Sequence, residues 1–169
     1  TPFPHAFPAN NPFPGSVATF SSETQPSVPF EIRNLTLPQK NPWQRPIRPI
    51  DIAFLSNGDA LLTTLDGDLW RIKNIDSDKA TWTRAAFGFY EPIALETNAD
   101  DQVFVLGRDQ VTEVIDTNQD GTFDEYRCAS DAFQQTLHTR DFATSLALEP
   151  DGSFLIAKGG ISSNKADEE

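Results

Sequence analysis

The sequence contains few of the residues that several classes of protein require. Its single cysteine, Cys128, rules out an internal disulfide, and neither a CxxC metal-binding pair nor a CxxCH haem-attachment motif is present. No apolar run is long enough to cross a membrane as a helix. Methionine is absent and the chain begins at Thr1, which indicates a processed, trimmed or partly observed chain whose first residues do not form a signal peptide.

Basic residues are also scarce. Lys and Arg total 13 against 25 Asp and Glu, so the net charge is -12 over 169 residues. Nucleic-acid binding needs a basic surface, and no basic stripe exists, so we expect no nucleic-acid partner. The acidic balance suits a solvated surface or bound cations. The length suits one domain with an additional tail.

Proline is abundant only at the start of the chain. Eleven of the 13 prolines fall in residues 1–50, interleaved with aromatic side chains. Because proline blocks helices and lacks a ladder donor, residues 1–48 are predicted to form an extended Pro- and Phe-rich arm. The aromatic side chains indicate that the arm docks on its own body or on a neighbour, although a disordered leader is the alternative.

After the arm the sequence consists of short apolar runs separated by Gly, Asp and Asn, and this pattern predicts antiparallel hairpins over residues 49–160. Residues 161–169 are polar and are predicted to be a tail. The three tryptophans are predicted to lie in the core between sheets. The expected strands are Asp51–Leu55, Ala60–Thr64, Leu69–Lys73 and Thr81–Ala86, then Pro92–Glu96, Val103–Leu106, Val111–Ile115 and Asp124–Cys128, then Ser145–Glu149 and Ser153–Lys158.

The strand pattern repeats. The motifs that begin at Ile52, Ile93 and Leu146 are separated by about 41 and about 53 residues. Each motif is followed by a polar turn and a second apolar strand. The predicted fold class is therefore all-β: part of a β-propeller, with about two and a half four-stranded blades. A β-sandwich is the alternative.

One turn has the pattern of a calcium-binding loop. Oxygen-bearing side chains alternate along DTNQDGTFD, and Gly121 permits a sharp turn between them. Arg127 stands where an EF-hand has a bidentate Glu, and strands flank the loop, so a helical calcium sensor is not expected. A loop in which the carboxylates only cap backbone donors is the alternative. The predicted ligands of a structural calcium ion are Asp116, Asn118, Asp120, Thr122 and Asp124.

Several segments between about Asn41 and Gly160 form a recognisable combination. They are NPW from Asn41, RPIDIAFLSNGDALLTTLDGDLWRI from Arg48, W-x-R at Trp82, GFYEP from Gly88, VLGRDQVTEVIDTNQDGTFDEY from Val105, and His138 followed by LALEPDGSFLIAKGG from Leu146. Together they resemble the propeller domain of secreted planctomycete and verrucomicrobial proteins that often carry a c-type haem domain, a family similar to soluble glucose and sorbosone dehydrogenases. The resemblance implies a periplasmic or extracellular propeller, possible use of pyrroloquinoline quinone (PQQ), and electron transfer to haem c on sequence not present here.

Strand order predicts which turns meet at one end of the sheets. In a four-stranded meander, the turn between the second and third strands and the link to the next sheet lie at the same end, which in propellers surrounds the central channel. We call this end the channel face, and the calcium-like loop is expected at the opposite end. Candidate substrate-binding residues on the channel face are Tyr90, Glu91, Arg108 and Asp109, and His138 is a candidate catalytic base.

Three functions remain open from the sequence. The first is a propeller segment of a secreted or periplasmic sugar- or alcohol-dehydrogenase-like protein that works with a haem electron acceptor. The second is a non-enzymatic protein-binding or assembly module. The third is a calcium-stabilised carbohydrate-binding β domain. The expected partners are the remainder of a parent protein or another subunit that completes the propeller, with a carbohydrate or alcohol as substrate and no membrane span.

Overall fold

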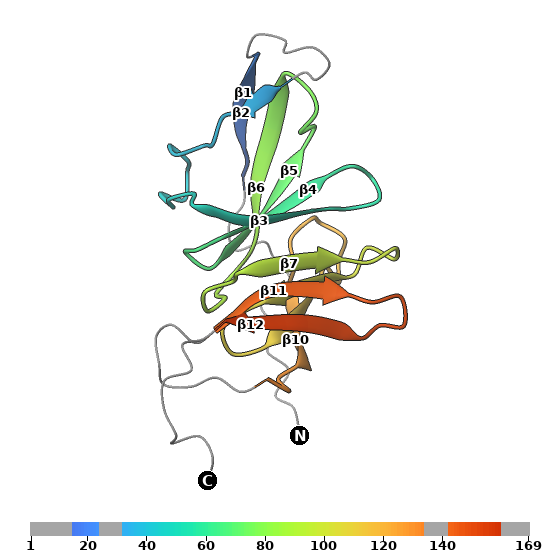
Figure 1. The fold of residues 1–169 in the computed structure, drawn as a ribbon. Helices are drawn as coiled ribbons and strands as arrows, with labels where there is room; N and C mark the ends of the chain where they lie inside the picture. Colours follow the sequence, from blue (N-terminus) through green and yellow to red (C-terminus); the bar gives the residue numbers. More distant parts are fainter. Residues whose placement is uncertain (1–14, 24–31, 134–141, 160–169) are drawn as a thin grey trace.

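The structure is a computed structural model that describes residues 15–23, 32–133 and 142–159. Within these residues the chain is all-β, with three antiparallel sheets and no helix (Figure 1). Accordingly, the described residues contain no helix that could span a membrane. The predicted all-β class is confirmed.

The first sheet has the strand order β2-β1-β6-β5-β4-β3, the second β10-β9-β8-β7 and the third β11-β12. The second and third sheets are meanders, because consecutive strands pair with each other, whereas in the first sheet the meander from β3 to β6 is extended by β1, which pairs with β6. The strands of the first sheet are β1 (Val17–Glu23), β2 (Arg33–Leu35), β3 (Pro49–Phe54), β4 (Ala60–Thr64), β5 (Asp68–Lys73) and β6 (Lys79–Phe87). Those of the other two are β7 (Ala94–Thr97), β8 (Val103–Leu106), β9 (Val111–Ile115), β10 (Glu125–Ser130), β11 (Phe142–Leu148) and β12 (Phe154–Gly159).

Each of the ten predicted strands is present, with shifts at the ends that have physical causes. Strand β7 begins at Ala94 rather than Pro92, since proline has no N–H to donate to the ladder. Strand β6 begins at Lys79, two residues earlier than predicted, because β1 pairs beside it from Val17 to Phe20. The arm therefore contributes two strands that the sequence pattern did not predict.

The three sheets pack on one another in chain order. We call the side of each sheet that faces the next sheet its front, and the opposite side its back. Leu61 and Leu69 on the front of the first sheet share one core with Leu95 and Val105 on the back of the second. A second core joins the front of the second sheet to the back of the third. The inner strands β3, β7 and β11 lie side by side in succession, as propeller blades do.

The arm covers most of the back of the first sheet. Trp70 and Trp82 are fully buried there, in a core between the first sheet and the arm rather than between two sheets as predicted. Trp43 of the arm meets Trp70 edge to face, with ring centroids 5.3 Å apart, and Ile47 completes this core. The indole nitrogen of Trp82 donates to Thr19 of β1 over 2.8 Å. The arm thus buries apolar surface that a preceding sheet would otherwise cover.

Candidate functional site

The channel face forms where the β4–β5 turn, the β6–β7 link and the β8–β9 turn meet. The backbone N–H of Phe89 donates to the carbonyl of Gly67 over 3.2 Å, and that of Arg108 donates to the carbonyl of Tyr90 over 2.8 Å. Gly67 has a φ of +86°, and a Cβ there would lie 2.5 Å from the Phe89 carbonyl oxygen. Only glycine allows the link to lie this close to the turn.

Three of the predicted substrate-binding residues form one cluster on this face. Arg108 Nη1 lies 2.7 Å from Glu91 Oε2, and its guanidinium carbon lies 5.9 Å from the centroid of the Tyr90 ring. The Tyr90 side chain is 57% exposed. Glu91 has a φ of 46°, a left-handed conformation that costs free energy in a residue with a Cβ and is common at functional sites.

The other two predicted channel-face residues are less well defined. Asp109 lies in the same β8–β9 turn as Arg108 and is exposed. Arg108 itself pairs with Glu91 of the neighbouring link. His138 lies outside the described residues.

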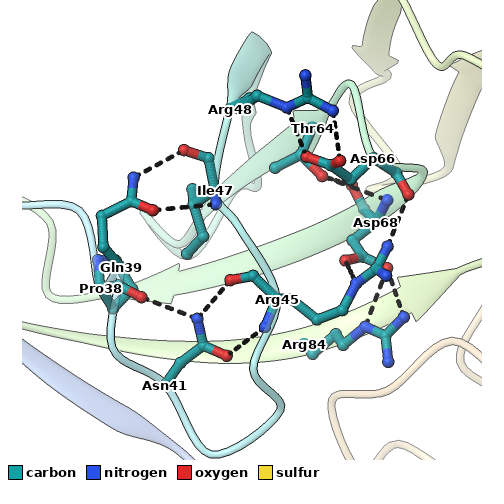
Figure 2. A network of polar contacts seen from close by, with 10 residues as sticks. All are labelled: Pro38, Gln39, Asn41, Arg45, Ile47, Arg48, Thr64, Asp66, Asp68 and Arg84. Atoms are coloured by element: carbon teal, nitrogen blue, oxygen red, sulfur yellow. Dashed lines mark hydrogen bonds and ion pairs between the residues drawn. The ribbon is translucent and has the colours of Figure 1, made fainter.

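A buried carboxylate lies beneath this face, at a position that strand order placed on the channel face but that was not among the predicted site residues. Asp68, at the start of β5, has a side chain that is only 1% exposed and is flanked by two arginines (Figure 2). Arg45 Nε donates to Asp68 Oδ2 over 2.8 Å, and Arg84 Nε donates to Asp68 Oδ1 over 3.0 Å. Because each carboxylate oxygen has a cationic donor, the buried charge is compensated.

The same network fixes the arm to the β4–β5 turn (Figure 2). Arg48 makes two parallel hydrogen bonds to the carboxylate of Asp66, and its donation holds the pKa of that carboxyl below its ordinary value. Arg45 Nη2 donates to the Asp66 carbonyl over 2.7 Å. Asn41 closes the arm's own turn by donating to two carbonyls and accepting from the Arg45 N–H. The arm is therefore held by charge as well as by apolar packing.

A second pair of carboxylates lies on the inner strands. Asp51 of β3 accepts a hydrogen bond from the backbone N–H of Leu95 over 2.9 Å, and this contact brings β3 and β7 together. Glu96 of β7 lies nearby. Burial raises the pKa of Glu96 above its ordinary value, and the negative charge of Asp51 raises it further.

The predicted calcium loop lies at the opposite end of the second sheet, and its side chains accept hydrogen bonds from its own backbone. Both carboxylate oxygens of Asp116 accept, one from the N–H of Asp120 over 3.1 Å and one from that of Gly121 over 2.8 Å. Asp120 accepts from Thr122 over 2.8 Å. Asp124 is held by the N–H and hydroxyl of Thr117. These bonds tie the three carboxylates to the backbone and side chains of the loop itself.

The described residues contain no group of three or more His, Cys, Asp or Glu side chains arranged to hold a metal ion. The donor set of the loop is nevertheless chemically suited to calcium, since it consists of hard oxygens and each carboxylate has lone pairs beyond those used by backbone donors. The loop is also anchored: Phe123 is buried in the core between the first and second sheets, and its N–H donates to Ala85 of β6 over 2.8 Å. The loop therefore joins two sheets.

Comparison with known protein families, with curated proteins and with solved structures finds no match to this chain. Inference about its function therefore rests on the residues and their geometry.

Proposed function

We propose that this chain is the propeller segment of a secreted or periplasmic sugar- or alcohol-dehydrogenase-like protein, and that its channel face binds a hydroxylated substrate. One observation carries the proposal: Tyr90, Glu91 and Arg108, which strand order predicted to share one face, form one cluster in which Tyr90 is exposed and the other two are half-buried. The strained backbone of Glu91 supports it, because such strain is retained where function needs it.

The chemistry of the cluster suits a sugar. An exposed tyrosine ring can stack on the apolar face of a pyranose. The Glu91 carboxylate accepts hydrogen bonds from hydroxyl groups and the Arg108 guanidinium donates them. Because the two side chains are already paired, their orientation costs little conformational entropy when the ligand binds.

Oxidation of the bound hydroxyl requires an electron acceptor, for which we propose PQQ or a haem on other sequence. This chain's own contribution is to bind and orient the substrate. His138 remains the proposed base that takes the hydroxyl proton.

Calorimetric titration with a panel of mono- and oligosaccharides tests substrate binding. Glu91→Gln and Arg108→Gln should each weaken binding about tenfold, because each removes a charged hydrogen bond. The matched control is Glu125→Gln, which breaks the similar but exposed Glu125–Arg127 pair on β10 and should leave binding unchanged. A panel with no binder, or variants that bind like the parent chain, would contradict the proposal.

A dye-linked oxidation assay with and without PQQ then separates the enzyme from a binding domain. Turnover of a sugar that binds the channel face supports the dehydrogenase. Binding without turnover, despite bound cofactor, favours the calcium-stabilised carbohydrate-binding domain instead.

We also propose that the loop from Asp116 to Asp124 holds a structural calcium ion, with Asn118, Asp120 and Thr122 as further ligands. Its place at the end of the second sheet remote from Tyr90 supports a stabilising role. The ion would neutralise the repulsion among the loop carboxylates.

A further inference from the structure

The inner strand of the first sheet exposes two large apolar side chains. Ile52 is 42% exposed and Phe54 is 55% exposed. In the register of β3 and β4 they stand opposite Leu62 and Ala60, which are buried in the core on the back of the sheet. Ile52 and Phe54 therefore belong to the back of the first sheet, at its inner edge, and we call them the back strip.

One equivalent residue in each of the other two sheets is covered by the preceding sheet. Leu95 of β7 is the third residue of its repeat motif, as Phe54 is; it is 3% exposed and packs on the first sheet, whereas Ile93, the counterpart of Ile52, packs against the core shared with the third sheet. Leu146 of β11 corresponds to Ile52 and is buried against the second sheet. The back strip is thus half of a joint that the chain completes twice elsewhere.

The other half of this joint is an alanine opposite a leucine on the two inner strands. This pair is Ala53 with Leu61 in the first sheet and Ala94 with Leu106 in the second. Both pairs pack against the following sheet. The third sheet has the same pair, Ala147 opposite Leu155, on its front. There both residues are exposed, Leu155 by 57%, and we call them the front pair.

The arm covers the back of the first sheet over β4, β5 and β6. Among the described residues, the back strip on β3 is left uncovered. Neither the back strip nor the front pair includes a charged residue, although the net charge of the chain is -12.

We propose that a second copy of this chain docks head to tail, with its front pair packed on the back strip of the first copy. The contact is heterologous, so each copy keeps one free half, and the assembly closes into a ring only if the rotation between copies allows it. The apolar surface on each side is small, so the dissociation constant should be about micromolar or weaker. This assembly is independent of any ligand on the channel face.

Analytical ultracentrifugation over a range of concentrations tests the proposal. The parent chain should form dimers or larger species. Phe54→Arg and Leu155→Arg should each abolish them, because each places a charge in one half of the joint. The matched control, Phe20→Arg, changes a phenylalanine on β1 that is also exposed and should leave association unchanged. Circular dichroism establishes that each variant is folded.

Mixing the two arginine variants tests directly whether the two halves of the joint bind each other. The Phe54→Arg chain keeps its front pair and the Leu155→Arg chain keeps its back strip, so an equimolar mixture should form dimers and nothing larger. A second measurement captures weak association: in a Cys128→Ser background, Phe54→Cys with Leu155→Cys should give disulfide-linked multimers under mild oxidation.

A parent chain that stays monomeric and gives no linked multimers would overturn the proposal. So would self-association that both arginine variants retain. If Phe54→Arg lowers the melting temperature of a monomer, the back strip is covered from within one chain, and the second copy is again excluded.

Discussion

At the scale of single residues, Asp68 is a fully buried carboxylate whose charge must be compensated by its neighbours. Its carboxylate is buried at the start of β5 and is compensated only by Arg45 and Arg84. The desolvation of such a charge is recovered only while both donors stay in place. Its role is therefore to bind the arm, β5 and β6 to one another.

Asp68→Asn should lower the free energy of unfolding by about 3 kcal/mol, since it leaves two guanidinium groups facing a neutral amide. The expected loss of stability is no larger than this because Arg45 is partly exposed, so solvent screens part of its interaction with Asp68. Urea denaturation followed by tryptophan fluorescence measures the change. Glu125→Gln in the exposed pair should cost less than about 0.5 kcal/mol, and equal effects of the two variants would contradict this account of Asp68.

Glu96 predicts how stability depends on pH. Its pKa is higher in the folded chain than in the unfolded chain, so the folded state binds the proton more tightly. Its contribution to stability is fully present below the unfolded pKa and is lost as the pH rises through the folded pKa. Glu96→Gln should therefore raise the melting temperature at neutral pH and have no effect below about pH 4. A gain that persists in acid would contradict this cause.

At the scale of elements, the loop between β9 and β10 has two stabilising contributions that can be separated. Its backbone hydrogen bonds to Asp116 operate in any solution, whereas a calcium ion would act only when present. Calcium should therefore raise the melting temperature of the parent chain relative to chelator, and Asp116→Ala should lower it in both solutions and remove the difference. Identical melting of the parent chain with and without calcium would exclude the ion.

The strands from β3 to β12 were predictable because each is a short run rich in apolar residues that is bounded by a turn containing Gly, Asp or Asn. Strands β1 and β2 were not, because β1 gains its hydrogen bonds from β6, about sixty residues away, within a Pro-rich context. Strand order alone also brought Tyr90, Glu91 and Arg108 together. Strand order could not predict that Arg45 pairs with Asp68, because the path of the arm depends on the packing of Trp43 and Ile47 against the first sheet.

At the scale of the whole molecule, polar contacts hold neighbouring turns together at both ends of the sheets. The channel face has paired ions, with Arg48 on Asp66 and Arg108 on Glu91. At the opposite end Arg71 pairs with Asp59, and Asp101 accepts hydrogen bonds from both the N–H and the hydroxyl of Ser56. The sheets are thus joined by charged side chains at each end.

The arm also has a consequence for the order in which the chain folds during synthesis. Every residue of the core on the back of the first sheet lies between Val17 and Trp82. The front of that sheet, in contrast, needs Leu95 and Phe123. Once a ribosome has released the chain as far as Phe87, it has supplied all six strands of the first sheet, and one face of that sheet can be complete while the second sheet is still being made. The nascent chain then exposes the apolar surface of only one side of this sheet, which lowers its tendency to aggregate.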